Sequence, residues 1–287
     1  MIRFILNGYY RSGTTILWWI MKQSNPRMIH LYEPLHPDLP KVISKWSVGQ
    51  RDGLHGLPIW DDWLAIPKHK LVEYLRRFRE DHLPVNVKDV IRRFEPINEL
   101  GLDVTLQPNR LHLVIGELAV FYGCKWAHIV RNPYDTWIEH FPTNLQKNER
   151  ALKGESKSWD YGAMFFLQPT YELISKLEGV NVPSDDWIGK FVVCWSYCNY
   201  KAIEQWRTFG HGFVFDYETL TRNPVATLRF LSMNTPIRWK TSYAGLIKRD
   251  RVNICPDSIR KLIYERIDEY VPVKWIRWWW EWMEDRS

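Results

Sequence analysis

Residues 8–15 combine glycine, arginine and small hydroxyl side chains in the spacing of a phosphate-binding loop. The run Gly8-Tyr9-Tyr10-Arg11-Ser12-Gly13-Thr14-Thr15 has the G-x-x-x-x-G pattern and lies between a short apolar segment and a helical pattern. In such a loop the backbone N–H groups and the N-terminus of the following helix surround an anion. Thr14 stands where an ATP-binding loop carries lysine. The pattern therefore predicts an anion site, with Arg11 beside it, that lacks the nucleoside triphosphate machinery.

Two further groups suited to this chemistry follow apolar segments that we expect to be strands. Glu33 and His36 come after residues 28–32, and Arg131 comes after residues 126–130. The carboxyl ends of parallel strands meet at one edge of a sheet, so we expect these side chains to lie beside the loop. A guanidinium group holds a phosphate by two parallel hydrogen bonds, and a carboxylate can accept a proton.

The elements that must position these groups alternate along the chain. Short apolar runs predict strands at residues 2–6, 28–32, 83–87, 126–130 and 212–216. Helical patterns occupy residues 14–23, 67–81, about 110–123, 158–179 and 184–209. This alternation predicts the α/β class, with a P-loop-type parallel sheet flanked by helices and a helical C-terminal extension. We expect residues 33–66 to form a long loop, and Pro169 to kink or break its helix.

Length and composition favour a single domain over residues 1–287. The chain is 45% hydrophobic and 25% charged, and its net charge of +6 is spread along the sequence. That balance suits a small anionic ligand better than a nucleic acid. We expect no metal site, because the four cysteines and nine histidines show no metal-ligand spacing, and we expect buried thiols. No apolar run is long enough to span a membrane and the first strand leaves no room for a signal peptide, so we expect a cytoplasmic protein.

Three segments resemble motifs of the sulfotransferases that use 3'-phosphoadenosine-5'-phosphosulfate (PAPS). Residues 11–15 resemble the 5'-phosphosulfate-binding loop. Residues 31–36 (Leu-Tyr-Glu-Pro-Leu-His) resemble a segment of the carbohydrate sulfotransferases, and the distance from Arg11 to Glu33 is similar to that in tyrosylprotein sulfotransferases. Residues 128–135 (His-Ile-Val-Arg-Asn-Pro-Tyr-Asp) are similar to the signature that binds the 3'-phosphate. The resemblance covers about residues 2–235, with gaps at 37–82 and 142–190.

The resemblance implies transfer of a sulfuryl group from PAPS to a hydroxyl of an acceptor, a carbohydrate or glycolipid, without a metal. It implies that the co-substrate is bound by the loop, by basic residues and by the position of the family's serine, namely Arg11, Ser12, Gly13, Thr14, Thr15, Arg131, Glu139, Lys248, Arg249 and Arg251. Glu33 is the expected base. The further candidates for catalysis are Arg11, Lys88, His36 and His140.

Two positions depart from the family pattern and keep alternatives open. Asn132 replaces an aspartate, and Glu139 stands where the family usually shares the 3'-phosphate through a serine. A nucleotide or small-molecule kinase on the same topology is one alternative. A catalytically inactive anion-binding protein of the same fold is the other.

The segment from about residue 273 to 285 carries tryptophan at helical spacing. Trp275, Trp278, Trp279 and Trp282 fall on one face of the predicted helix. We expect this face to pack on the protein's own core, with a dimer contact or docking on a membrane surface as alternatives.

Overall fold

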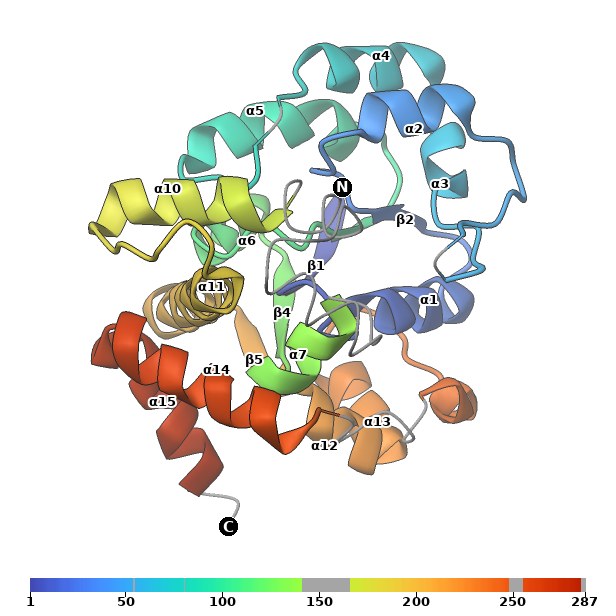
Figure 1. Cartoon of the computed structure of the whole chain (residues 1–287). Coiled ribbons are helices and arrows are strands. Elements are labelled where there is room, and N and C mark those ends of the chain that lie inside the picture. The colour runs from blue at the N-terminus through green and yellow to red at the C-terminus, as the bar shows by residue number, and fades with distance from the viewer. Residues whose placement is uncertain (54, 80, 141–165, 248–254, 285–287) are drawn as a thin grey trace.

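Five parallel strands form the centre of the structure, in the order β2-β3-β1-β4-β5 (Figure 1). The computed structural model describes residues 1–53, 55–79, 81–140, 166–247 and 255–284. The strands are β1 (Ile2–Gly8), β2 (Ile29–Tyr32), β3 (Val104–Gln107), β4 (Lys125–Val130) and β5 (Gly212–Asp216). Because β1 is central, its carboxyl end lies between those of β3 and β4, where ligands of open α/β sheets bind.

Helices flank this sheet, as the alternation of patterns predicted. The first half of the chain contributes α1 (Thr14–Ser24), α2 (Leu39–Lys45), α3 (Asp61–Leu64), α4 (Lys68–Arg76), α5 (Val87–Asn98), α6 (Ile115–Tyr122) and α7 (Pro133–His140). The second half contributes α10 (Gln168–Glu178), α11 (Trp187–Phe209), α12 (Tyr217–Arg222), α13 (Pro224–Asn234), the 3₁₀ helix η3 (Thr241–Leu246), α14 (Asp257–Tyr270) and α15 (Val273–Glu284). The predicted α/β class with a helical C-terminal part is therefore confirmed.

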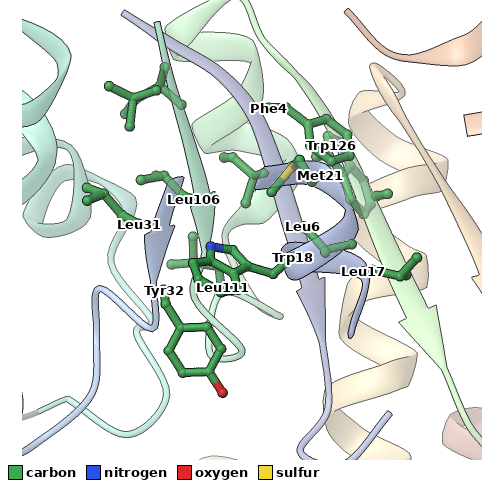
Figure 2. Close-up of a cluster of buried hydrophobic side chains, with 14 of the residues drawn as sticks. Phe4, Leu6, Leu17, Trp18, Met21, Leu31, Tyr32, Leu106, Leu111 and Trp126 are labelled. Carbon is green, nitrogen blue, oxygen red and sulfur yellow. The ribbon is translucent and has the colours of Figure 1, made fainter. Parts of the chain in front are cut away.

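A large hydrophobic cluster fastens α1 to the sheet (Figure 2). Trp18 of α1 is fully buried, donates a hydrogen bond from its indole to the carbonyl of His30 (3.1 Å), and packs edge-on against the Tyr32 ring. Leu17 and Met21, on the same helix, are also fully buried. This packing fixes the N-terminus of α1 relative to the ends of β1 and β2.

A second hydrophobic cluster surrounds α11 and contains the tryptophans of α15. The Trp195 ring lies 5.8 Å from Trp278 and 5.4 Å from Trp279, and Trp275 lies 4.8 Å from Tyr197. The three α15 tryptophans are at most 5% exposed, which confirms that the face packs on the protein's own core. They are not available to a dimer partner or a membrane, and the side chain of Trp282 lies outside the described part.

Three sequence-based expectations were wrong or incomplete. Residues 83–87 form no strand, because Asn86 caps α5 by accepting from the Lys88 amide (2.9 Å). The third strand is β3, whose four residues alternate apolar and polar side chains too briefly for a clear pattern. Residues 33–66 contain α2 and α3 rather than a continuous loop. Pro169 lies in the first turn of α10, where its missing N–H costs nothing, and residues 158–165 of the expected helix lie outside the described residues.

The buried character of the four cysteines was predicted correctly, and all four are free thiols. Burial raises the pKa of the Cys198 thiol, so it stays protonated. Among the described residues, no helix is both long and apolar enough to cross a membrane.

We predict that Trp275→Ala destabilises the fold by about 3–5 kcal/mol, because it empties a buried site between α15 and α11. Trp206→Ala is the control, since this α11 tryptophan is 41% exposed. Chemical denaturation of both variants measures the free energy of unfolding. Equal losses in the two would show that α15 adds little to the core.

Candidate functional site

The loop between β1 and α1 requires glycine at two positions. A Cβ on Gly8 would lie 2.4 Å from Ser12 Oγ and 2.7 Å from the Ile129 side chain. Gly13 adopts a φ of +94°, and a Cβ there would press on the Tyr217 ring at 2.5 Å. Ser12 closes the turn from within, since its hydroxyl donates to the Tyr9 carbonyl (2.6 Å). The loop is thus a tight turn that leads directly into the first turn of α1.

The N-terminus of α1 carries no side-chain cap, so it can accept an external anion. Gly13 occupies the cap position and supplies no hydrogen-bonding side chain. The first N–H groups of a helix lack partners within the helix and carry a partial positive charge. Thr14 and Thr15 form the first turn. This backbone geometry is compatible with the predicted anion site, which stays a prediction.

Strained backbone marks the carboxyl edge of the sheet. Arg11, Glu33 and Asn109 have φ values of +63°, +40° and +56°, and they follow β1, β2 and β3. Only one other non-glycine residue in the described ranges has positive φ. Such conformations cost free energy in side chains other than glycine and gather where function demands a fixed geometry.

A hydrogen bond joins the end of β2 to the phosphate-binding loop. The Tyr32 hydroxyl lies 3.0 Å from Thr15 Oγ1, although β3 separates β2 from β1 in the sheet. Burial, and next the charge of Glu33, raise the pKa of Tyr32 well above its ordinary value. The phenol therefore stays neutral, and its hydrogen bond ties the residue before Glu33 to the loop.

The Glu33 carboxylate lies close to two polar side chains at this edge of the sheet. The Asn109 side-chain amide donates to Glu33 Oε1 (2.9 Å), and His36 Nε2 lies 3.8 Å from Glu33 Oε2. Gln107 Nε2 donates to the side-chain oxygen of Asn109, Oδ1 (2.6 Å), which orients the Asn109 amide toward the Glu33 carboxylate. Burial lowers the pKa of His36, which outweighs the opposing effect of Glu33, so the imidazole is neutral at neutral pH. The Glu33 side chain is 13% exposed and can be reached from solvent.

Arg131 lies on the other side of the loop, after β4. Its Nη1 donates to the Arg11 carbonyl (2.9 Å), and its guanidinium lies 4.5 Å from the centre of the Tyr217 ring. Its Nη2 lies 3.8 Å from Glu139 Oε1. Arg131 thus supports the loop backbone and already pairs with a carboxylate where the resemblance implied a phosphate partner.

The replacement of aspartate by Asn132 has a structural reason. The Asn132 amide donates to Asp135 Oδ2 (2.8 Å) and to Glu218 Oε1 (2.5 Å), and its backbone N–H also donates to Glu218 (3.0 Å). Burial raises the pKa of Glu218. An aspartate at 132 would add a third carboxylate to this buried pair, whereas the amide supplies the donors that the pair needs.

A buried polar network supports the loop from beneath. The Asn7 amide lies 3.2 Å from His112 Nδ1 and 3.1 Å from His128 Nδ1, and its oxygen accepts from the Leu111 amide (3.3 Å). His128 Nε2 lies 2.8 Å from Asn199 Oδ1 of α11. Burial lowers the pKa of His128 to about 4, so both nitrogens serve as neutral hydrogen-bonding groups. The network links β1, β4, α11 and the segment after β3.

Several functional candidates were missed by sequence reasoning. Arg110 is fully buried beside Asn109, and its Nη1 lies 3.3 Å from His82 Nδ1. The strand was expected at residues 83–87 instead of 104–107, so no site residue was expected directly after β3. The signal was present in Gln107-Pro108-Asn109-Arg110, a polar group directly after Val104-Thr105-Leu106.

Other predicted residues are not brought to the edge of the sheet by the described structure. Lys88 lies exposed in the first turn of α5 rather than at a strand end, so the expectation of a strand there was wrong. His140 is the last residue of α7, and its side chain lies outside the described part. Lys248, Arg249 and Arg251 also lie outside the described residues.

Comparisons with known proteins give a sequence relative and several structural neighbours. No protein-family profile matches the chain. An uncharacterized protein of Archaeoglobus fulgidus is 29% identical over 314 aligned positions, which cover 96% of this chain and 99% of the relative.

Two of the structural neighbours are sulfotransferase domains. The domain from the curacin biosynthetic pathway has a TM-score of 0.40 and 15% identity, covering 88% of this chain and 78% of that one. The domain from the Synechococcus PCC 7002 olefin synthase has a TM-score of 0.40 and 15% identity, covering 91% and 82%. Likeness at this level assigns no activity to the chain.

We predict that Asn132→Asp destabilises the protein by about 3 kcal/mol at pH 8, because it buries a carboxylate against Glu218 and Asp135. Repulsion and burial should hold the folded-state pKa values of the new carboxyl and of Glu218 above the unfolded ones. The loss of folding stability is therefore complete above the folded-state pKa values, and it becomes smaller as the pH falls toward the ordinary carboxyl pKa range. Urea denaturation at pH 8 and pH 5 measures it. The double variant Asn132→Asp/Glu218→Gln, which restores a donor, should recover stability; a single variant as stable as the parent at pH 8 would refute this account.

Proposed function

We propose that this protein is a sulfotransferase that transfers a sulfuryl group from PAPS to a hydroxyl of a carbohydrate or glycolipid acceptor. One observation supports this most directly: a carboxylate, Glu33, is held by Asn109 at the same sheet edge as an anion-binding loop. The contact between Tyr32 and Thr15, which joins the residue before Glu33 to the loop, supports this arrangement. A proton acceptor beside an anion site is the arrangement that transfer to a hydroxyl requires.

In this proposal the donor lies across the carboxyl end of β1. The amides and hydroxyls of residues 12–15 hold the 5' end, and the uncapped α1 N-terminus contributes its partial positive charge. Arg11 stabilises charge on the leaving phosphate oxygen. Its positive charge reaches this edge of the sheet, since it opposes the rise in the pKa of Tyr32.

The proposed reaction is an in-line displacement at sulfur. The acceptor oxygen forms a bond to sulfur while the bond between sulfur and the bridging phosphate oxygen breaks. The electron pair stays on that oxygen, which leaves with 3'-phosphoadenosine-5'-phosphate (PAP). The proton of the acceptor hydroxyl passes to the Glu33 carboxylate. Preorganised donors lower the barrier because they need no rearrangement when charge moves onto the leaving group.

Arg131 binds the 3'-phosphate in this proposal, and Glu139 is the residue it must give up. The ion pair between them is long, 3.8 Å, and the Glu139 side chain is 25% exposed. The Arg131 side chain is itself only 5% exposed, so a phosphate that displaces the carboxylate keeps this buried guanidinium paired with an anion. Tyr217 holds the guanidinium from its other face.

A carboxylate on the 3'-phosphate arginine is also what an inactive relative of the same fold would show. Binding of PAP without turnover is the outcome that would favour that alternative. The kinase alternative requires a carboxylate for Mg²⁺ and a loop lysine. Thr14 occupies the lysine position, and a strict Mg²⁺ requirement with ATP would favour the kinase.

We predict that PAP binds and that Arg11→Ala and Arg131→Ala each lower its affinity about 10- to 100-fold, because each removes a charge-assisted contact to phosphate. Isothermal calorimetry measures the dissociation constants. Arg207→Ala is the control, since Arg207 is exposed near the end of α11, which leads into the amino end of β5. Unchanged affinity in both site variants would end this assignment.

We predict that Glu33→Gln lowers turnover of labelled PAPS by about 10²–10⁴ while PAP affinity is kept, because the amide preserves the shape and removes the proton acceptor. The assay uses a panel of glycans and glycolipids in the presence of EDTA, which the reaction should tolerate. His36→Ala and His140→Ala are the competing variants. Near-normal turnover in Glu33→Gln, with loss in either histidine variant, would make a histidine the base.

A further inference from the structure

Arg110 is a fully buried cation. It is 0% exposed, and its Nε and Nη2 have no hydrogen-bond partner in the described part of the chain. No carboxylate among the described residues forms an ion pair with it. Its contacts are the Nη1 to His82 distance of 3.3 Å and the faces of the Tyr10 and Phe166 rings, at 5.3 and 4.9 Å.

Such a group is costly for a fold to keep. A buried guanidinium normally has its N–H groups paired, because the loss of water around the charge must be offset. Arg93 shows the usual solution in the same chain, since it is 3% exposed and pairs with Asp81 at 3.1 Å. The unpaired Nε and Nη2 of Arg110 therefore need an explanation other than stability.

The surroundings of Arg110 place it on the Glu33 side of the loop. Arg110 follows β3, whereas Arg131 follows β4 on the opposite side of β1. Phe166 contacts both Arg110 and the His36 ring, at 4.9 and 5.9 Å, and His36 lies against Glu33.

Electrostatic effects agree with this position. The charge of Arg110 adds to the effect of burial in lowering the pKa of His36, and burial with Arg110 lowers the pKa of His82 to about 4. Both imidazoles are therefore neutral near neutral pH. Glu33 is the acidic neighbour of His36, and Asp81 is that of His82. The charge of Arg110 thus acts on His36, the imidazole that lies against the proposed base Glu33.

We infer that Arg110 binds an anionic group of the acceptor, so that the hydroxyl compound presented to Glu33 carries a carboxylate, phosphate or sulfate. The identification of this anionic compound as the acceptor rests on the proposed function. The binding of an anion by Arg110 does not depend on that function. The two free N–H groups, Nε and Nη2, lie on one edge of the guanidinium and match the two oxygens of such an anion. An anion there would complete the hydrogen bonding that the protein leaves open.

Binding of matched sugars tests this inference without turnover or nucleotide. The probes are glucuronate, glucose 6-phosphate and glucose 6-sulfate, with glucose as the neutral reference, measured by thermal shift and calorimetry. We expect at least one anionic sugar to bind the parent protein more tightly than glucose. Arg110→Met should weaken that binding about 10- to 100-fold, and Arg110→Lys should weaken it less. Binding of no anionic sugar above glucose, or equal binding by Arg110→Met, would overturn the inference.

Stability separates a binding residue from a structural one. Met keeps contact with the Tyr10 and Phe166 rings while it removes the buried charge, so Arg110→Met should have a melting temperature equal to or above that of the parent. Arg93→Met, the matched control, should lower it. A comparable loss of melting temperature in both variants would show that Arg110 is structural.

PAP affinity is the last measurement: a loss in Arg110→Met as large as in Arg11→Ala would move Arg110 to the donor site. If PAP binds neither the parent protein nor any variant while an anionic sugar binds through Arg110, the proposed function fails and the anion site at Arg110 stands.

Discussion

The Asn7 side chain is the constraint on which the carboxyl edge of the sheet depends. It is fully buried in the central strand and contacts His112, His128 and the Leu111 amide. A single amide offers donors and an acceptor, so it can satisfy several buried partners at once. Through His112, which lies 3.1 Å from the Asn109 carbonyl, the network reaches the residue that holds Glu33. The loop, the β3 end and α11 are thereby positioned relative to one another.

Neutral imidazoles make this arrangement workable in a protein interior. Burial lowers the pKa of His112 well below its ordinary value, and it does the same for His128. Uncharged rings can exchange hydrogen bonds with amides without the large cost of a buried charge. Glu33 and Asn109 have positive φ values at the same edge of the sheet. The hydrogen-bonded network beneath them keeps this strained backbone in place.

Sequence reasoning succeeded where a pattern was long or chemically unusual. The loop at residues 8–15 and the apolar runs at β1, β4 and β5 were recognised because glycine spacing and buried strands leave strong signals. The β3 strand and Arg110 were missed, since four alternating residues carry little information and a buried arginine looks like a surface one. The role of Asn132 also needed the structure, because its carboxylate partner Glu218 lies 86 residues away.

The order of elements along the chain has a consequence for synthesis. The Trp195 indole of α11 donates to the Arg131 carbonyl, so the end of β4 leans on α11, while the other side of Trp195 is covered by α15. A ribosome delivers α11 well before α14 and α15. The nascent chain therefore displays an uncovered apolar helix during translation, a period in which chaperones bind and aggregation competes with folding. Translation speed over residues 210–284 becomes a determinant of how much protein reaches its native state.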